Sequence, residues 1–69
     1  MSKILDLRQK RSELWDKAKA FLDSASRSED GTLSAEDLST YEKMEADIDS
    51  LGREISAMER REQLDAKMS

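Results

Sequence analysis

The sequence contains no proline, no cysteine and no histidine, and it has only two glycines among its 69 residues. Without proline, nothing in the chain forces a break inside a helix. Without cysteine, neither a disulfide nor a thiolate zinc site can stabilise the fold. Without histidine, the chain lacks the side chain that most readily exchanges protons near neutral pH. These absences favour a helical protein that is held together by packing and point away from catalysis.

Acidic residues are plentiful, with 16 Asp and Glu in the chain. Paired carboxylates do acid–base work only where a cleft makes one of them differ from the other, and two long helices offer no evident cleft. We interpret these residues as the solvated faces of helices. The chain is therefore expected not to be an enzyme and to have no catalytic residues, no metal site and no cofactor.

Long apolar runs are also missing. No stretch approaches the roughly 20 apolar residues of a membrane span, and the N-terminus has no apolar signal region. Basic residues adjoin only as Lys10 with Arg11 and as Arg60 with Arg61, while the net charge is -4. Nucleic-acid binding normally uses a larger basic surface. Neither a membrane nor a nucleic acid is expected as a partner.

The composition predicts a fold of low stability. Ordering each residue costs about 1.5 kcal/mol, or roughly 100 kcal/mol for the whole chain. Only 36% of the residues are hydrophobic, against 41% that are charged. Self-association would bury additional apolar surface, so we expect a homo-oligomer.

The first half of the chain has the apolar spacing of an amphipathic helix over residues 2–25. Ser2 can serve as its N-cap, and Asp6 lies near the positive end of the helix dipole. Steps of three and four residues form a heptad seam, made of Ile4, Leu7, Arg11, Leu14, Ala18, Phe21 and Ala25. Arg11 has two interpretations: its stem packs while the guanidinium reaches water, or it forms an ion pair that selects a register or a partner. Leu5, Trp15 and Leu22 widen the apolar stripe.

A polar connector over residues 26–34 follows. Asp30 and Gly31 indicate a tight turn, because glycine tolerates a positive φ. Ser34 is the predicted N-cap of the second helix, with Asp37 three residues later as in a capping box. Leu33 and Leu38 stand at the two ends of a hydrophobic staple.

The connector also has the length and the central glycine of a calcium-binding loop. If Ser26 is position 1, Gly31 falls at position 6 and Asp37 at position 12. However, Ser26 and Ser28 stand where carboxylates are expected, and Asp37 is shorter than the usual bidentate Glu. A capped turn explains the same residues more simply, so a degenerate calcium sensor is the weaker interpretation.

A second helix is predicted over residues 35–67. Its seam again steps by three and four, through Leu38, Tyr41, Met44, Ile48, Leu51, Ile55 and Met58. Beyond Met58 the apolar residues leave this seam and appear at Leu64 and Met68. Gly52 lies in the middle of the helix, either because a neighbour approaches closely or as a tolerated weak point.

If the chain reverses near Asp30, residues whose numbers add to about 60 face each other. Residues 1–25 carry six Lys/Arg and four Asp/Glu, and residues 26–69 carry six and twelve, so charges of +2 and -6 favour the antiparallel pairing. The predicted fold is an all-α, two-helix antiparallel hairpin of the coiled-coil type that forms a single domain over residues 1–69. Packing within the chain is predicted for Ile4, Leu7, Leu14, Trp15, Phe21, Leu38, Tyr41, Met44, Ile48, Leu51 and Ile55.

The second helix is longer than the first can cover. At about 1.5 Å per residue, its last ten residues would project some 15 Å beyond the first helix. Either another molecule covers the apolar side chains of this overhang, or the overhang frays. The residues predicted to contact other chains are Arg11, Met58, Leu64 and Met68.

A series of short segments along nearly the whole chain matches a known pattern, and it consists of residues 3–8, 18–22, 31–37 and 41–48, then Leu51, Glu54, Ile55, Glu59, Arg60 and residues 64–66. In the order and spacing of these residues the chain resembles the N-terminal delta, or scaffolding, domain of tailed-bacteriophage major capsid proteins. It implies a helical scaffold fused to the capsid subunit, located in the host cytoplasm and inside the immature capsid. It further implies that the segment promotes procapsid assembly through contacts with itself and with capsid subunits, and that a maturation protease removes it. No catalytic or ligand residues are carried over.

One departure from that family is that the chain stops at Ser69, with no shell-forming domain and no recognisable processing site. Either it is an excised fragment or it is a separate helical protein, and the lack of a helix stop signal after Ala66 favours a fragment. The alternative function is that of a small coiled-coil adaptor that recognises one partner helix.

Overall fold

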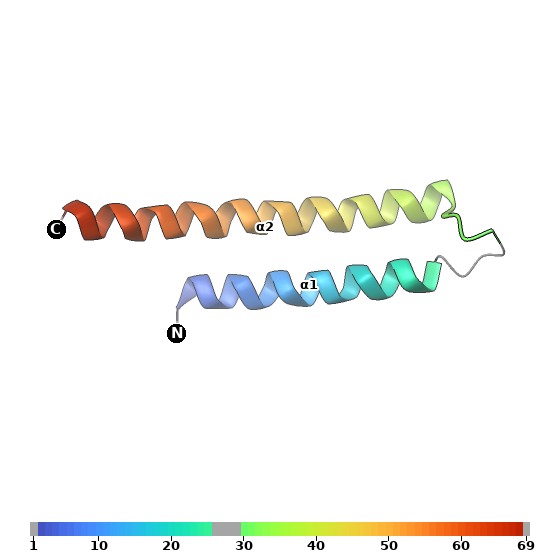
Figure 1. Ribbon diagram of the computed structural model, residues 1–69, viewed down its shortest axis with the longest axis horizontal. Helices are drawn as coiled ribbons and strands as arrows, with labels where there is room; N and C mark the ends of the chain where they lie inside the picture. The colour runs from blue at the N-terminus through green and yellow to red at the C-terminus, as the bar shows by residue number, and fades with distance from the viewer. Residues whose placement is uncertain (1, 26–29, 69) are drawn as a thin grey trace.

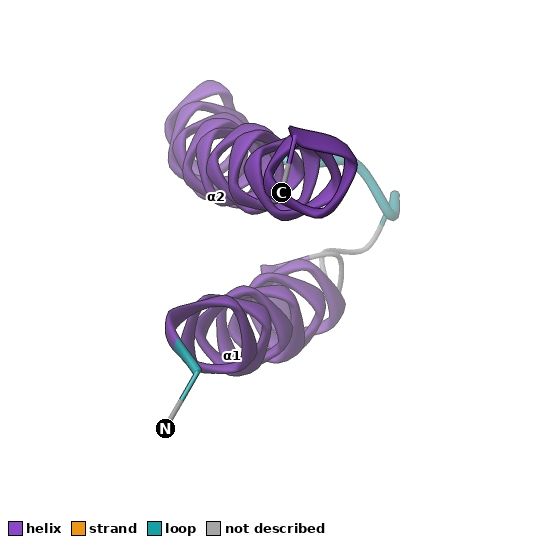
Figure 2. Ribbon diagram, turned by 90° about the vertical axis from the view of Figure 1, so that its left-hand side faces the viewer, coloured by secondary structure: helices purple, strands orange, loops and turns teal. Residues whose placement is uncertain are grey.

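The computed structural model describes residues 2–25 and 30–68, which form two antiparallel helices (Figure 1). Helix α1 covers Lys3–Ala25 and helix α2 covers Ala35–Met68. Both begin and end within one residue of the bounds predicted from the sequence, and the described residues include no strand. The predicted all-α hairpin with a longer second helix is confirmed. Seen along the helices, α1 and α2 lie side by side as a single layer (Figure 2).

A serine directly precedes each helix. The Ser2 carbonyl accepts the Asp6 N–H at 3.1 Å, and the Ser34 carbonyl accepts the Leu38 N–H at 2.9 Å. Ser34 Oγ also accepts the Asp37 N–H at 3.0 Å, which satisfies a backbone donor that has no partner within the helix. The N-cap predicted at Ser34 is therefore present. It fixes the point at which the chain enters α2.

The described part of the connector is a tight turn. Gly31 has a φ of 72°, a backbone conformation that side chains with a Cβ rarely adopt. Asp30 Oδ1 accepts hydrogen bonds from the Thr32 N–H at 3.1 Å and from Thr32 Oγ1 at 2.8 Å. These bonds form an Asx turn that directs the chain toward Ser34. Ser26 and Ser28, two positions of the calcium-loop alternative, lie outside the described residues.

The core between the helices is thin. Among the described residues, the buried side chains are Ile4, Ala18, Leu51 and Ile55, and Ile55 is the most enclosed large one, with 2% of its surface exposed. Ala18 is fully buried although it is small, so α1 approaches α2 closely there. Of the other seam residues Leu38 is exposed, and the rest are half-buried, namely Leu7, Arg11, Leu14, Phe21, Ala25, Tyr41, Met44, Ile48 and Met58.

Two residues predicted to pack between the helices are only partly covered. Trp15 is 44% exposed and Leu38 is 47% exposed. Each residue of an α-helix is turned by about 100° from the one before. Trp15 follows the seam residue Leu14 directly, so it lies at the edge of the apolar stripe. Leu38 lies about 100° around α2 from Ile55 by the same measure, because a spacing of 3.5 residues drifts on a helix of 3.6 residues per turn.

Helix α2 is longer than α1, with 34 residues against 23, and it continues past the start of α1 (Figure 1). We call residues 60–68 the overhang. Every residue of the overhang is exposed, including those that continue the inward face of α2. The molecule is correspondingly elongated, with principal extents of 59 × 20 × 13 Å.

Candidate functional site

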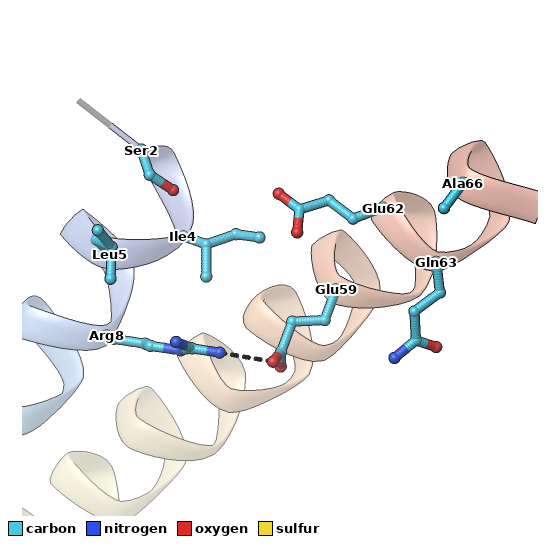
Figure 3. Close-up of a pocket in the computed structure, with 8 residues that line it drawn as sticks. All are labelled: Ser2, Ile4, Leu5, Arg8, Glu59, Glu62, Gln63 and Ala66. Carbon is cyan, nitrogen blue, oxygen red and sulfur yellow. Dashed lines mark hydrogen bonds and ion pairs between the residues drawn. The ribbon is translucent and has the colours of Figure 1, made fainter. Parts of the chain in front are cut away.

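An ion pair joins the two helices where the overhang begins. Arg8 Nη2 donates to Glu59 Oε2 at 2.6 Å, between side chains that are 47% and 41% exposed. Figure 3 shows Arg8 reaching from α1 to Glu59 on α2, with Ile4 directed toward the same helix. An exposed pair of this kind contributes about 0–1 kcal/mol, so it fixes the register of the helices more than it stabilises them.

Around this ion pair lies a shallow, open groove. Its lining comes from both helices and mixes apolar with charged side chains (Figure 3), namely Ser2, Ile4, Leu5, Arg8, Glu59, Glu62, Gln63 and Ala66. Leu5 is one of the large apolar side chains that remain exposed here. The groove has no deep apolar cavity in which a small molecule would be enclosed, and small-molecule sites are usually concave and enclosed.

Arg11 lies over Gly52 on the opposite helix. A Cβ added at Gly52 would stand 3.7 Å from Arg11 Nη1, which is an ordinary van der Waals distance. Arg11 is half-buried and, among the described residues, forms no ion pair. This geometry fits the first interpretation of Arg11, in which the stem packs and the guanidinium reaches the surface. It also means that Gly52 is not needed to make room for Arg11.

The four residues predicted to contact other chains fall into two groups. Arg11 and Met58 are half-buried and line grooves with residues of the opposite helix, so they already have neighbours within the chain. Leu64 is 53% exposed and Met68 is 80% exposed. Their predicted contacts with another chain stay predictions, and Leu64 and Met68 are the two that are open to such contacts.

Trp15 borders an acidic groove on one side of the hairpin. The groove is also lined by Glu42, Glu45 and Asp49 of α2. The Lys19 ammonium lies 5.5 Å from the centre of the Trp15 ring, a cation–π contact, and it also forms an ion pair with Asp16 at 3.5 Å. The sequence analysis missed the Trp15–Lys19 contact, although the spacing of four residues on one helix could have indicated it.

The Arg8–Glu59 pair was also missed. Its residue numbers add to 67 rather than to about 60, and the long Arg8 side chain spans part of this difference. The charge signs were available in the sequence, but the register at the open end was not, because it depends on how the two helices settle against each other.

The parts of the chain that the structure describes, residues 2–25 and 30–68, hold no group of three Asp or Glu side chains arranged to bind a metal ion. No helix in these segments has the length and apolar character required to cross a membrane. Comparison with known proteins found no matching family model, no matching curated protein and no matching solved structure.

Proposed function

We propose that the chain is a structural association module that forms larger assemblies through repeated contacts between copies. The observation that carries this proposal is the overhang, where Leu64 and Met68 expose large apolar side chains on a helix that α1 does not cover. Covering a large apolar side chain is worth roughly 1.5–3 kcal/mol. A thin core and an uncovered helix end are what a chain would have if association completes its fold.

The direction of Leu64 supports the same proposal. Leu64 follows Ile55 by nine residues, so at about 100° per residue it points roughly opposite to Ile55 on α2. Since Ile55 faces α1, a shift of α1 along α2 would still not cover Leu64. A partner for Leu64 therefore has to approach from the outer side of the hairpin.

Together with the resemblance to delta domains, these features lead us to propose a role in procapsid assembly. In this role the chain is fused to capsid subunits, and weak contacts between many linked copies raise the local concentration without fixing errors. The proposed location is the interior of the immature capsid in the host cytoplasm, and a maturation protease is a proposed partner. We propose no catalytic function.

The proposal is tested by sedimentation of the chain over a concentration series from micromolar to millimolar. We expect reversible association, and we expect Leu64→Ser with Met68→Ser to weaken it about tenfold, because these substitutions remove apolar surface worth one or more kcal/mol. Leu5→Ser is the matched control, since it removes an equally exposed leucine from α1. A folded chain that stays monomeric at millimolar concentration would refute self-association.

The capsid role needs a separate test. We expect the reading frame that encodes these residues to continue into a shell-forming domain, and deletion of the segment from that protein to abolish the assembly of closed shells. Shells that still form with normal size and yield would contradict a scaffolding role.

A second candidate is an adaptor that binds one partner helix. The acidic groove beside Trp15 favours it, because Glu42, Glu45 and Asp49 could receive a basic helix. A monomeric chain that retains one foreign protein through this groove, and loses it on Glu45→Lys, would support this candidate over self-association.

A further inference from the structure

Six exposed residues of α2 form a stripe on the flank of the helix that is turned away from Ile55, and several of them border the grooves that α2 shares with Arg11 and Trp15. They are spread over nearly the whole helix, and at about 100° per residue they all lie within roughly 80° of one another and about 100–180° from Ile55. We call this the outer stripe, and it consists of Leu38, Glu42, Asp49, Arg53, Arg60 and Leu64.

The chemistry of the outer stripe is symmetric about residue 51. A leucine stands 13 residues to either side, at Leu38 and Leu64. Glu42 is mirrored by Arg60, and Asp49 is mirrored by Arg53. Each acidic residue is thus mirrored by a basic one. Each leucine is mirrored by a leucine.

The four charged residues of the outer stripe have no partner for their charge within the described hairpin. The ion pairs of the described residues join Arg8 with Glu59, Lys19 with Asp16, and Arg61 with Asp65. None of them uses a residue of the outer stripe. Glu42, Asp49, Arg53 and Arg60 are exposed and can therefore pair with another molecule.

We propose that two copies associate through their outer stripes, with the two α2 helices antiparallel and residue 51 at the two-fold axis. This inference rests on the proposed association and assigns its interface. In this register Leu38 meets Leu64 of the second copy, Glu42 meets Arg60, and Asp49 meets Arg53. Because the interface is two-fold, each contact forms twice, which gives four ion pairs and two leucine contacts. Ala46 and Ser56, also symmetric about residue 51, are small enough for the helices to approach near the axis.

Charge decides the orientation and the occupant. In a parallel pair each residue would face its own copy, so Glu42 would oppose Glu42 and Arg60 would oppose Arg60, which is unfavourable. A nucleic acid or an anionic membrane would favour Arg53 and Arg60 but would be repelled by Glu42 and Asp49. The two acidic and two basic residues that mirror one another fit a second copy of the same surface, and Lys67, which lies in the same arc, would face Ala35 of that copy.

A charge-reversal cycle tests the register. Arg60→Glu replaces two attractive contacts with two repulsive ones, and we expect it to weaken dimerisation about tenfold at low salt. Glu42→Arg should weaken it similarly. The double variant Glu42→Arg with Arg60→Glu restores opposite charges across the interface, so it should recover most of the wild-type affinity. Dissociation constants come from sedimentation equilibrium, with circular dichroism as the check on helicity.

The chain offers matched controls that keep the same change of charge. Arg61→Glu and Glu54→Arg alter exposed residues of the same helix that point about 100° away from Arg60 and Arg53, the charged stripe residues next to them. Neither should change the dissociation constant by more than about twofold, since exposed charges off the interface contribute little. If Arg61→Glu weakens association as much as Arg60→Glu does, the effect is one of net charge and the register is wrong.

A cross-link provides an independent readout, because the chain has no cysteine of its own. In Leu38→Cys with Leu64→Cys, the two cysteines of one chain lie 26 residues apart on α2, roughly 39 Å, and cannot join within the chain. We expect mild oxidation to give a covalent dimer with this double variant and with neither single variant. Dimers from Leu64→Cys alone would instead place two overhangs against each other and overturn the proposal.

The outcomes separate this inference from the function on which it rests. A wild-type chain that stays monomeric refutes both. A wild-type chain that associates with no rescue by the double charge reversal and no cross-link from the paired cysteines refutes only the outer-stripe interface.

Discussion

The two parts of α2 differ in the residues on the face that continues the seam toward α1. In the part covered by α1, the inward positions are apolar, and Leu51 and Ile55 are buried. In the overhang, Glu62 and Asp65 take the positions where the seam would continue, and the apolar residues Leu64 and Met68 point elsewhere. The comparison teaches that the end of a heptad seam marks the end of the partner helix. The apolar residues beyond that point, Leu64 and Met68, are exposed.

The largest expected loss of stability comes from a substitution in the part of α2 that α1 covers. Ile55→Ala removes the most enclosed large side chain, and we expect the free energy of unfolding to fall by about 2–4 kcal/mol, measured by urea denaturation followed by circular dichroism. Leu64→Ala is the matched control in the overhang, and under dilute monomeric conditions it should cost less than about 0.5 kcal/mol. Equal losses from both variants would mean that Leu64 is also covered in the single chain.

A smaller effect is expected from a substitution that stabilises the covered part of α2. Gly52→Ala should raise the free energy of unfolding by about 1 kcal/mol, because alanine favours the helix and its Cβ meets only Arg11 Nη1 at 3.7 Å. Thermal unfolding measures the change. Gly31→Ala makes the same substitution at a positive φ and should instead destabilise the hairpin by about 1–2 kcal/mol. A loss of stability in Gly52→Ala would show that Arg11 approaches more closely than this.

The smallest effect concerns the boundary between the two parts. Arg8→Ala removes the ion pair with Glu59 and should cost up to about 1 kcal/mol at low salt, with most of the cost lost at 1 M NaCl. Thermal unfolding at the two salt concentrations measures this difference. Lys17→Ala, on the same helix and without an ion pair among the described residues, is the control. A cost that persists at high salt would assign the role of Arg8 to packing of its stem.

The helices and their starts could be predicted from the sequence because local chemistry determines them. Ser34 caps α2 through bonds to its own neighbours, and Gly31 makes the turn through its own φ. The heptad steps also identified the face on which Ile55 is buried. These features depend on residues close together in the chain, so one sequence contains them.

The edges of the interface could not be predicted in the same way. Leu38 lies on the predicted heptad seam and Trp15 lies beside it. How far each is exposed depends on how two straight helices of 3.6 residues per turn drift from a 3.5-residue repeat. The Arg8–Glu59 pair depends on the register between helices. Part of the candidate site could be predicted from the sequence, since the spacing alone shows that Leu64 lies on a different face of the helix from the seam. Leu64 is 53% exposed in the single hairpin, and its contact with a second molecule is our proposal.

The distribution of buried residues has a consequence for how the two helices separate. The three large buried residues, Ile4, Leu51 and Ile55, lie from the middle of the hairpin toward the open end. Toward the connector the small Ala18 is buried, whereas Phe21 and Tyr41 are half-buried and Leu38 is exposed. The large buried side chains that hold the helices together thus lie far from the connector that joins them. Thermal fluctuations should therefore separate the helices first beside the turn and last beside the N-terminus. The connector keeps the two helices joined, and the buried residues toward the open end keep them aligned.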